Sequence, residues 1–264
     1  MLRPRIIPCL LLHQGGLVKT QAFKNPKYVG DPINAVKIFN EKEADELIVL
    51  DIDATVQGRE PDFGLIAKLA AECRMPLCYG GGVTTADQAT RIVDMGVEKV
   101  AVSAAALANP ALLTEMAAAV GRQSVVAVLD VRKKVGLFAK GFEICSQNAK
   151  VAHKQDPFGL AIQLQEAGAG EIVVNSVDRD GLMQGYDLDL AGQFRQTLKV
   201  PVTFLGGAGS LDDIGKLVSH VGVIGAAAGS LFVFKGRYRA VLINYPTPAQ
   251  KTQLCGEALA KSLV

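Results

Sequence analysis

Two glycine clusters in this sequence could hold phosphate groups. They are Gly80, Gly81 and Gly82 in the first, and Gly206, Gly207 and Gly209 in the second. Because glycine has no Cβ, backbone N–H groups can approach a ligand closely at such a turn. A bound phosphate also gains from the positive end of a helix that follows the turn. Two such turns predict a ligand with two phosphates; the alternative is that the glycines only make tight strand-to-helix turns.

The segments around these clusters repeat each other. Residues 76–105 read as an apolar strand, a glycine turn, an amphipathic helix and a second strand that ends in small residues, and residues 201–230 have the same pattern. The duplication favours phosphate binding. The predicted phosphate-binding residues are Gly81, Gly82, Ser103, Ala104, Gly206, Gly207, Gly229 and Ser230.

Carboxylates follow two other apolar runs. Asp130 ends VVAVLD, where it could act in catalysis or contact a substrate, or only cap the following loop. Asp178 and Asp180 lie in NSVDRDG, where Gly181 permits close backbone approach. These two aspartates are predicted to bind substrate, and an Asx-type turn explains them equally well.

Eight apolar runs must position these residues. They are Ile6–Leu12, Glu46–Ile52, Leu77–Tyr79, Val97–Val102, Ser124–Leu129, Glu171–Asn175, Val202–Leu205 and Val221–Ala226. Helical patterns separate them, at residues 31–44, 61–73, 108–120, 158–167 and 187–197. Apolar strands that alternate with helices predict a parallel sheet with a covered outer face, and eight such units predict an α/β fold of the (β/α)8 TIM barrel type. Chemistry is then expected at the C-terminal ends of the strands.

The repeat extends over most of the chain. LDIDAT matches NSVDRDG, and IIPCLL matches VVAVLD, so that Leu11 is equivalent to Asp130. We predict one domain built from two duplicated half-barrels, at about residues 1–122 and 123–240, with a C-terminal helix at about 246–262. The two longest connections, 12–30 and 131–155, are predicted lids or active-site walls, and GLFAKGFEI in the second is predicted to form a small hairpin.

Composition excludes several classes of function. The net charge is +2, which predicts neither a nucleic acid nor a membrane surface as partner. The five cysteines are scattered, without CxxC or histidine-rich metal spacing, so we expect free thiols in the cytoplasm, no metal and no cofactor.

RIIPCL, GGLVK, DELIVLDIDAT, GGGV, VVAVLD, NSVDRDG with GYD, and GGAG are together similar to the signatures of one family. From Arg5 to about Phe234 the chain resembles the cyclase (HisF-type) subunit of imidazole glycerol phosphate synthase. The resemblance implies a barrel that binds a bisphosphate at its C-terminal face and receives ammonia from a glutaminase (HisH-like) subunit at its N-terminal face. It also implies cyclisation by two aspartates, one on the first strand and one on the fifth.

The sequence departs from the family at one of these aspartates. Asp130 matches the fifth-strand acid, whereas the first-strand acid falls on Leu11. A leucine cannot transfer a proton, and a general acid or base contributes about 10² to 10⁴ in rate, so we expect cyclase activity to be lost or severely reduced.

The resemblance further implies an ammonia gate of four charged residues at the barrel floor. The matching positions are Arg5, Glu46, Lys99 and Glu171. The alternative is a ring of salt bridges that merely closes the floor, although exposed pairs of that kind contribute only about 0 to 1 kcal/mol.

Loss of the acid with retention of the gate resembles a branch of the family that works in acetamidino-sugar formation for surface polysaccharide (O-antigen). There the barrel is expected to pass ammonia to a separate sugar amidotransferase. Two alternatives remain open. One is an active cyclase (lyase) of histidine biosynthesis, with His13, Asp51 or a water-mediated group replacing the lost acid. The other is a sugar-phosphate isomerase of the two-aspartate type, which would lack the same acid.

Overall fold

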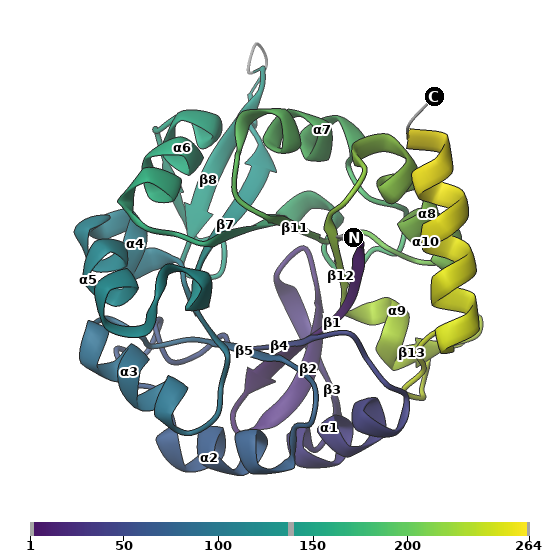
Figure 1. Ribbon diagram of the computed structural model, residues 1–264, viewed down its shortest axis with the longest axis horizontal. Helices are drawn as coiled ribbons and strands as arrows, with labels where there is room; N and C mark the ends of the chain where they lie inside the picture. The colour runs from purple at the N-terminus through teal and green to yellow at the C-terminus, as the bar shows by residue number, and fades with distance from the viewer. Residues whose placement is uncertain (1–2, 137–139, 263–264) are drawn as a thin grey trace.

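The computed structural model describes residues 3–136 and 140–262, and its centre is a closed ring of parallel strands (Figure 1). In order around the ring these are β1 (Arg5–His13), β4 (Leu47–Asp51), β5 (Leu77–Gly80), β6 (Lys99–Val102), β7 (Val125–Lys133), β10 (Glu171–Ser176), β11 (Val202–Leu205) and β12 (Gly225–Ala228). Each strand pairs in parallel with the next, and β12 pairs with β1 to close the ring. The predicted (β/α)8 TIM barrel is confirmed.

Helices cover the outer face of the ring (Figure 1). They are α1 (Pro32–Glu41), α2 (Phe63–Glu72), α3 (Ala86–Asp94), α4 (Ala104–Ala108), α5 (Ala111–Val120), α6 (Pro157–Ala167), α7 (Leu188–Thr197), α8 (Leu211–Val221), α9 (Ser230–Val233) and α10 (Pro248–Ser262), with the 3-10 turns η1 (Arg122–Ser124) and η2 (Val177–Arg179). Six of these helices follow an Asp, Ser or Thr whose side chain accepts a hydrogen bond from an N–H of the first turn. Such caps contribute about 1 kcal/mol each and fix where the helix begins.

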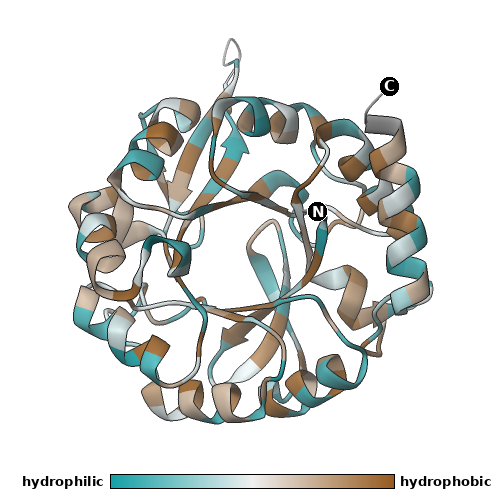
Figure 2. Ribbon diagram, in the orientation of Figure 1, coloured by the Kyte–Doolittle hydropathy of each residue, from teal (hydrophilic) through white to brown (hydrophobic). Residues whose placement is uncertain are grey.

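Side chains on the strands alternate between two apolar cores. On β10, Ile172 and Val174 pack in the core between strands and helices, while Val173 belongs to the cluster inside the ring. The inner cluster consists of Ile7, Cys9, Ile48, Cys78, Ala101, Val126, Val128, Val173, Leu205 and Ala227. Figure 2 shows brown, hydrophobic segments in the strands around the ring. The same alternation points Glu171 and Asn175 inward, at the N-terminal end (the floor) and the C-terminal end (the mouth) of the strand.

Both long connections form antiparallel strands. These are β2 (Gly16–Gln21) and β3 (Lys24–Gly30) after β1, and β8 (Phe142–Ser146) and β9 (Val151–His153) after β7. The end of GLFAKGFEI, from Phe142 on, does form one strand of a hairpin, and its partner is β7, which runs on to Lys133 upstream of that stretch. Residues 137–139 of the stretch lie outside the described residues. A hairpin follows the first strand of each predicted half-barrel, which supports the proposed duplication.

The last strand of the barrel was predicted four residues too early. Val221 is the final residue of α8, and Gly222, with a φ of 75°, ends that helix. The strand itself is Gly225–Ala228. The apolar run that begins at Val221 therefore combines the buried face of a helix end with a strand, and apolarity alone does not separate the two.

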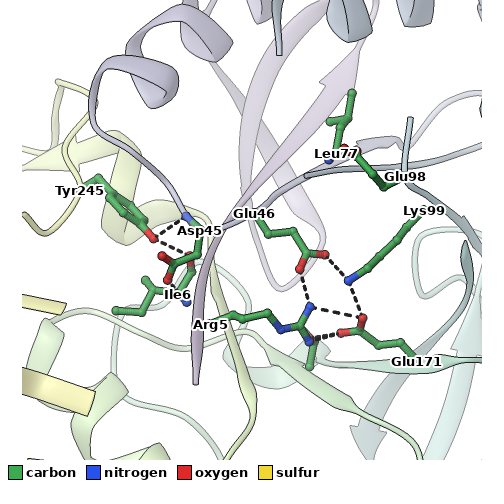
Figure 3. Close-up of polar contacts among 10 residues, drawn as sticks. Arg5, Ile6, Asp45, Glu46, Leu77, Glu98, Lys99, Glu171 and Tyr245 are labelled. Carbon is green, nitrogen blue, oxygen red and sulfur yellow. Dashed lines mark hydrogen bonds and ion pairs between the residues drawn. The ribbon is translucent and has the colours of Figure 1, made fainter. Parts of the chain in front are cut away.

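The C-terminal segment fastens the barrel floor. It follows the small hairpin of β13 (Phe234–Lys235) and β14 (Ala240–Val241). Tyr245 Oη accepts a hydrogen bond from Asp45 N (3.1 Å) and donates one to Ile6 O (2.7 Å), as Figure 3 shows. Lys251 of α10 donates to Asp45 Oδ1 (2.7 Å), and Asp45 Oδ2 accepts from Ile6 N (3.0 Å). These contacts clamp the starts of two neighbouring strands.

We expect Tyr245→Phe to lower the free energy of unfolding by about 1 to 3 kcal/mol, because it leaves Asp45 N and Ile6 O without their hydroxyl partner. Urea denaturation measures the change. The matched control is Tyr238→Phe, which removes a hydroxyl from a side chain that is 90% exposed and should change little. Equal effects of the two substitutions would contradict the clamp.

Candidate functional site

A cavity of about 160 Å³ opens at the mouth, among the C-terminal ends of the strands. It brings together every predicted mouth residue except one, namely Gly81, Gly82, Ser103, Ala104, Asp130, Asp180, Gly181, Gly206, Gly207, Gly229 and Ser230. The exception is Asp178, which is exposed, does not line the cavity and accepts a hydrogen bond from Lys133 N (2.7 Å). The predicted substrate contact of Asp178 therefore has no support in this geometry.

The glycine turns are required by packing as well as by any ligand. Gly206 has a φ of 101°, and a Cβ there would lie 2.6 Å from Ser176 O. At Gly81, with a φ of 123°, a Cβ would collide with the backbone of Asp51. Both interpretations of the glycines are thus compatible, since the turns that need glycine also line the cavity.

The mouth cavity is polar on one side and apolar on the other where it meets the barrel interior. Asn175 Nδ2 donates to Asp130 Oδ1 (3.0 Å), and these residues are neighbours in the β10–β7 register. Leu11 and Leu50 are the corresponding neighbours in the β1–β4 register. Burial raises the pKa of Asp130 to about 7, although the Asn175 hydrogen bond opposes the shift. The β7–β10 side therefore offers a carboxyl group whose pKa is raised to about 7, whereas the corresponding positions of β1 and β4 offer leucines.

The β2–β3 hairpin reaches across the mouth and is held there by Asp180. Asp180 Oδ2 accepts from Thr20 Oγ1 (2.7 Å) and Phe23 N (3.3 Å), and Asp180 O accepts from Ala22 N (2.9 Å). The hairpin carries Lys19, which lines the cavity and donates to Cys9 O. Burial lowers the pKa of Lys19. Lys19 was absent from the predicted site, and its place in the GGLVK signature was the signal for it.

His13, a proposed replacement for the lost acid, pairs with a carboxylate outside the mouth cavity. Its Nδ1 lies 2.8 Å from Asp53 Oδ1, and Asp53 Oδ2 accepts from Gln14 N (2.8 Å). Neither His13 nor Asp53 lines the mouth cavity. Asp51 does line it, but its Oδ1 accepts from Asp53 N and Ala54 N. The structure gives no support to a proton-transfer role for His13.

Four charged side chains meet at the barrel floor (Figure 3). Arg5 pairs with Glu46 through Nη1 and with Glu171 through Nη2 (2.7 Å). Lys99 Nζ bridges the same two carboxylates at 2.8 Å each. Burial opposes the charge on Glu171, yet Lys99 and Arg5 outweigh it and lower the pKa of Glu171 to about 2. The four predicted gate residues thus form one closed ion network, referred to below as the floor ring.

A threonine that the sequence analysis missed completes this network. Thr203 is fully buried, and its Oγ1 donates to Glu171 Oε1 (2.5 Å). Gly225 lies beside it in register, and a Cβ there would collide with Thr203 Oγ1. Strand alternation places Thr203, the second residue of β11, on the inward face, but only the pairing of β11 with β10 brings it to Glu171.

The described ranges, 3–136 and 140–262, contain no group of three or more His, Cys, Asp or Glu residues that could hold a metal ion. Within the same ranges, none of the helices has the length and hydropathy needed to cross a membrane.

Comparison with known proteins gives one consistent result. Residues 5–239 match the family model described as histidine biosynthesis protein. A protein of Vibrio vulnificus (strain YJ016), provisionally named imidazole glycerol phosphate synthase subunit hisF3, is 57% identical over 95% of this chain and 96% of its own. A Pseudomonas aeruginosa (strain PAO1) protein, provisionally named subunit hisF2 of the same enzyme, is 52% identical over 93% and 97%. The imidazole glycerol phosphate synthase subunit HisF of Clostridium botulinum (strain 657 / Type Ba4) is 34% identical over 89% and 92%.

Proposed function

The chain belongs to the histidine biosynthesis protein family as a HisF-type barrel subunit of imidazole glycerol phosphate synthase, and on that premise we propose that it conducts ammonia in a glutamine amidotransferase complex without cyclising a substrate itself. A HisH-like glutaminase docks at the floor and releases ammonia there. The ammonia passes the floor ring and travels through the barrel to the mouth. We place this complex in the cytoplasm.

The observation that carries the proposal is the contrast between the two ends of the barrel. At the floor, all four ring residues are present and paired. At the mouth, Leu11 and Leu50 face the cavity where the family chemistry needs a second acid. This contrast supports a barrel that admits ammonia but lacks one of the two proton-transfer groups of the family reaction.

The interior between the two ends suits a neutral molecule. Its lining consists of apolar side chains such as Ile7, Ile48 and Val173. Moving an ion into such surroundings costs several kcal/mol, whereas neutral ammonia carries no such penalty. The floor ring would admit ammonia only when its ion pairs separate, which a docked glutaminase could promote.

We propose that the acceptor of the ammonia is a separate sugar amidotransferase that makes acetamidino sugars for surface polysaccharide. The identity of 52 to 57% to one set of relatives, against 34% to the HisF of Clostridium botulinum, supports a separate branch of the family. The predicted phosphate-binding glycines at the mouth would then bind a phosphate-bearing ligand that regulates the glutaminase. Alternatively, they are a relic of the site for the ancestral substrate.

A second function, the active cyclase of histidine biosynthesis, is favoured by one observation. The pKa of Asp130 is raised to about 7, which is the range in which a general acid or base works best at neutral pH. That function still requires a second proton-transfer group, which the described mouth residues do not provide opposite Asp130.

An assay of the purified barrel with its candidate glutaminase separates these functions. The mixture receives the histidine-pathway bisphosphate, with either glutamine or an ammonium salt as nitrogen source. We expect no imidazole product from either source, while the complex assembles and releases ammonia from glutamine. Product formation from ammonium at an ordinary enzymatic rate would refute the conduit.

A further inference from the structure

The polar side of the mouth cavity contains hydrogen-bond acceptors that have no donor among the described residues. Asn175 is 6% exposed, and its Oδ1 is buried without a hydrogen-bond partner among the described residues. Its Nδ2 donates to Asp130 Oδ1, and no hydrogen bond from the described residues reaches Asp130 Oδ2. An ionised carboxylate can only accept, so the amide nitrogen faces Asp130 and the amide oxygen is left over. Leaving a buried acceptor unpaired costs about 1 to 3 kcal/mol.

The other carboxylates around the cavity are already engaged. Asp180 accepts from Thr20 and Phe23, and Asp51 accepts from the backbone of Asp53 and Ala54. Lys19, a buried amine that lines the cavity, donates to Cys9 O. Asp130 and Asn175 thus form a pair whose free oxygens are available to a ligand that brings its own N–H donors.

This pair stands where the barrel interior opens into the mouth. On β10, the inward side chains run from Glu171 of the floor ring through Val173 to Asn175. On β7, the inward Val126 and Val128 are followed by Asp130. Four strand residues span about 13 Å, so a molecule that passes the ring meets about that length of apolar lining before these acceptors.

We propose that Asp130 and Asn175 form a binding site for ammonia at the exit of the barrel. The ligand is ammonia, or ammonium when it retains the extra proton, with N–H groups donating to Asp130 Oδ2 and Asn175 Oδ1. Leu11 and Leu50, neighbours in the β1–β4 register, give the same cavity an apolar lining. The delivery of ammonia to this site rests on the proposed conduit, but the site itself is built from these side chains and needs neither the glutaminase nor the floor ring.

The role differs from acid–base catalysis in what it requires. Catalysis of the family reaction needs two acids on opposite sides of a bisphosphate, whereas holding ammonia needs two acceptors on the same side. The structure provides the second arrangement, because Asp130 and Asn175 are neighbours in register and Leu11 and Leu50 face them. A molecule held there is presented toward the open mouth, where an acceptor enzyme could take it.

The test is a pH titration of the Asp130 carboxyl carbon by NMR, in the barrel alone, with ammonium chloride or potassium chloride at equal concentration. Potassium matches ammonium in size and charge but donates no hydrogen bond. Asp180, Cys9 and Cys145 are the titratable groups that interact with Asp130, and they affect both salts equally. We expect the midpoint of Asp130 to fall by about one unit more in ammonium than in potassium, because a paired cation favours the ionised carboxylate.

Two variants complete the experiment. Asp130→Asn identifies the signal, and Asn175→Leu removes the amide oxygen and should weaken the apparent ammonium affinity by about tenfold. Identical titrations of the parent protein in the two salts would overturn the proposal, and this comparison needs no variant that could misfold. If ammonium binds while the barrel neither assembles with the glutaminase nor supports the release of ammonia from glutamine, the conduit is refuted and the site stands. If the complex assembles and releases ammonia but the two titrations are identical, the site alone is refuted.

Discussion

Replacing Lys99 with methionine is expected to lower the free energy of unfolding by about 3 to 5 kcal/mol at neutral pH, since it leaves two buried carboxylates with a single cation between them. Glu46 and Glu171 are only 3% and 4% exposed, and Lys99 bridges them at 2.8 Å each. Arg5 alone would then face two negative charges. Denaturation in urea at neutral pH measures the loss.

The control for this substitution is Lys216→Met. Lys216 also forms an ion pair, with Asp212 at 2.7 Å, but both side chains are largely exposed, so its removal should change little. The double variant Glu46→Gln with Lys99→Met should recover part of the stability, because it removes one of the two carboxylates that would otherwise share Arg5. If Lys99→Met and Lys216→Met behave alike, the floor ring is not a coupled buried network.

The stability of Lys99→Met should also depend on pH differently from that of the parent protein. In the parent protein the pKa of Glu171 is depressed from 4.5 to about 2, so Glu171 contributes stability that is present above pH 4.5 and lost as the pH falls toward 2. Lys99→Met removes part of that depression and has less stability to lose. The difference between parent and variant should therefore be largest at neutral pH and clearly smaller at about pH 3.

The barrel could be predicted from the sequence because its physical cause is local. Apolar strands that alternate with helices leave few architectures, and the strand ends place Asp130 and the glycines at one face. The matched pattern of 76–105 and 201–230 predicted that both glycine clusters line the mouth, and all of their glycines except Gly209 do. The sequence did not predict which side chains form hydrogen bonds with each other.

Asp178, Asp180 and Thr203 illustrate this limit. Asp178 and Asp180 lie two residues apart in NSVDRDG, yet one is exposed beside Lys133 and the other fixes the β2–β3 hairpin over the mouth. Thr203 became visible as part of the floor ring only when β11 was placed beside β10. These contacts join residues that are 32 to 160 positions apart, so no local sequence pattern encodes them.

Leu11→Asp is the substitution with the largest expected effect on chemistry. Leu11 lines the mouth cavity next to Leu50, at the register position equivalent to that of Asp130 beside Asn175. An aspartate there restores a proton-transfer group on the side opposite Asp130. With the histidine-pathway bisphosphate and an ammonium salt, we expect the rate of imidazole formation to rise by about 10² to 10⁴ over the parent protein.

The pH profile of that variant distinguishes catalysis from a change in binding. A second carboxylate in the mouth disfavours ionisation of the first, so the pKa of Asp130 should rise above its present value of about 7. One carboxyl group then stays protonated at neutral pH while the other is ionised, which gives a bell-shaped profile. Leu11→Asn, which has the same shape and cannot transfer a proton, should remain as inactive as the parent. If Leu11→Asp and Leu11→Asn give the same rate, the missing acid is not what separates this barrel from a cyclase, and the apolar side formed with Leu50 must itself prevent productive binding of the bisphosphate.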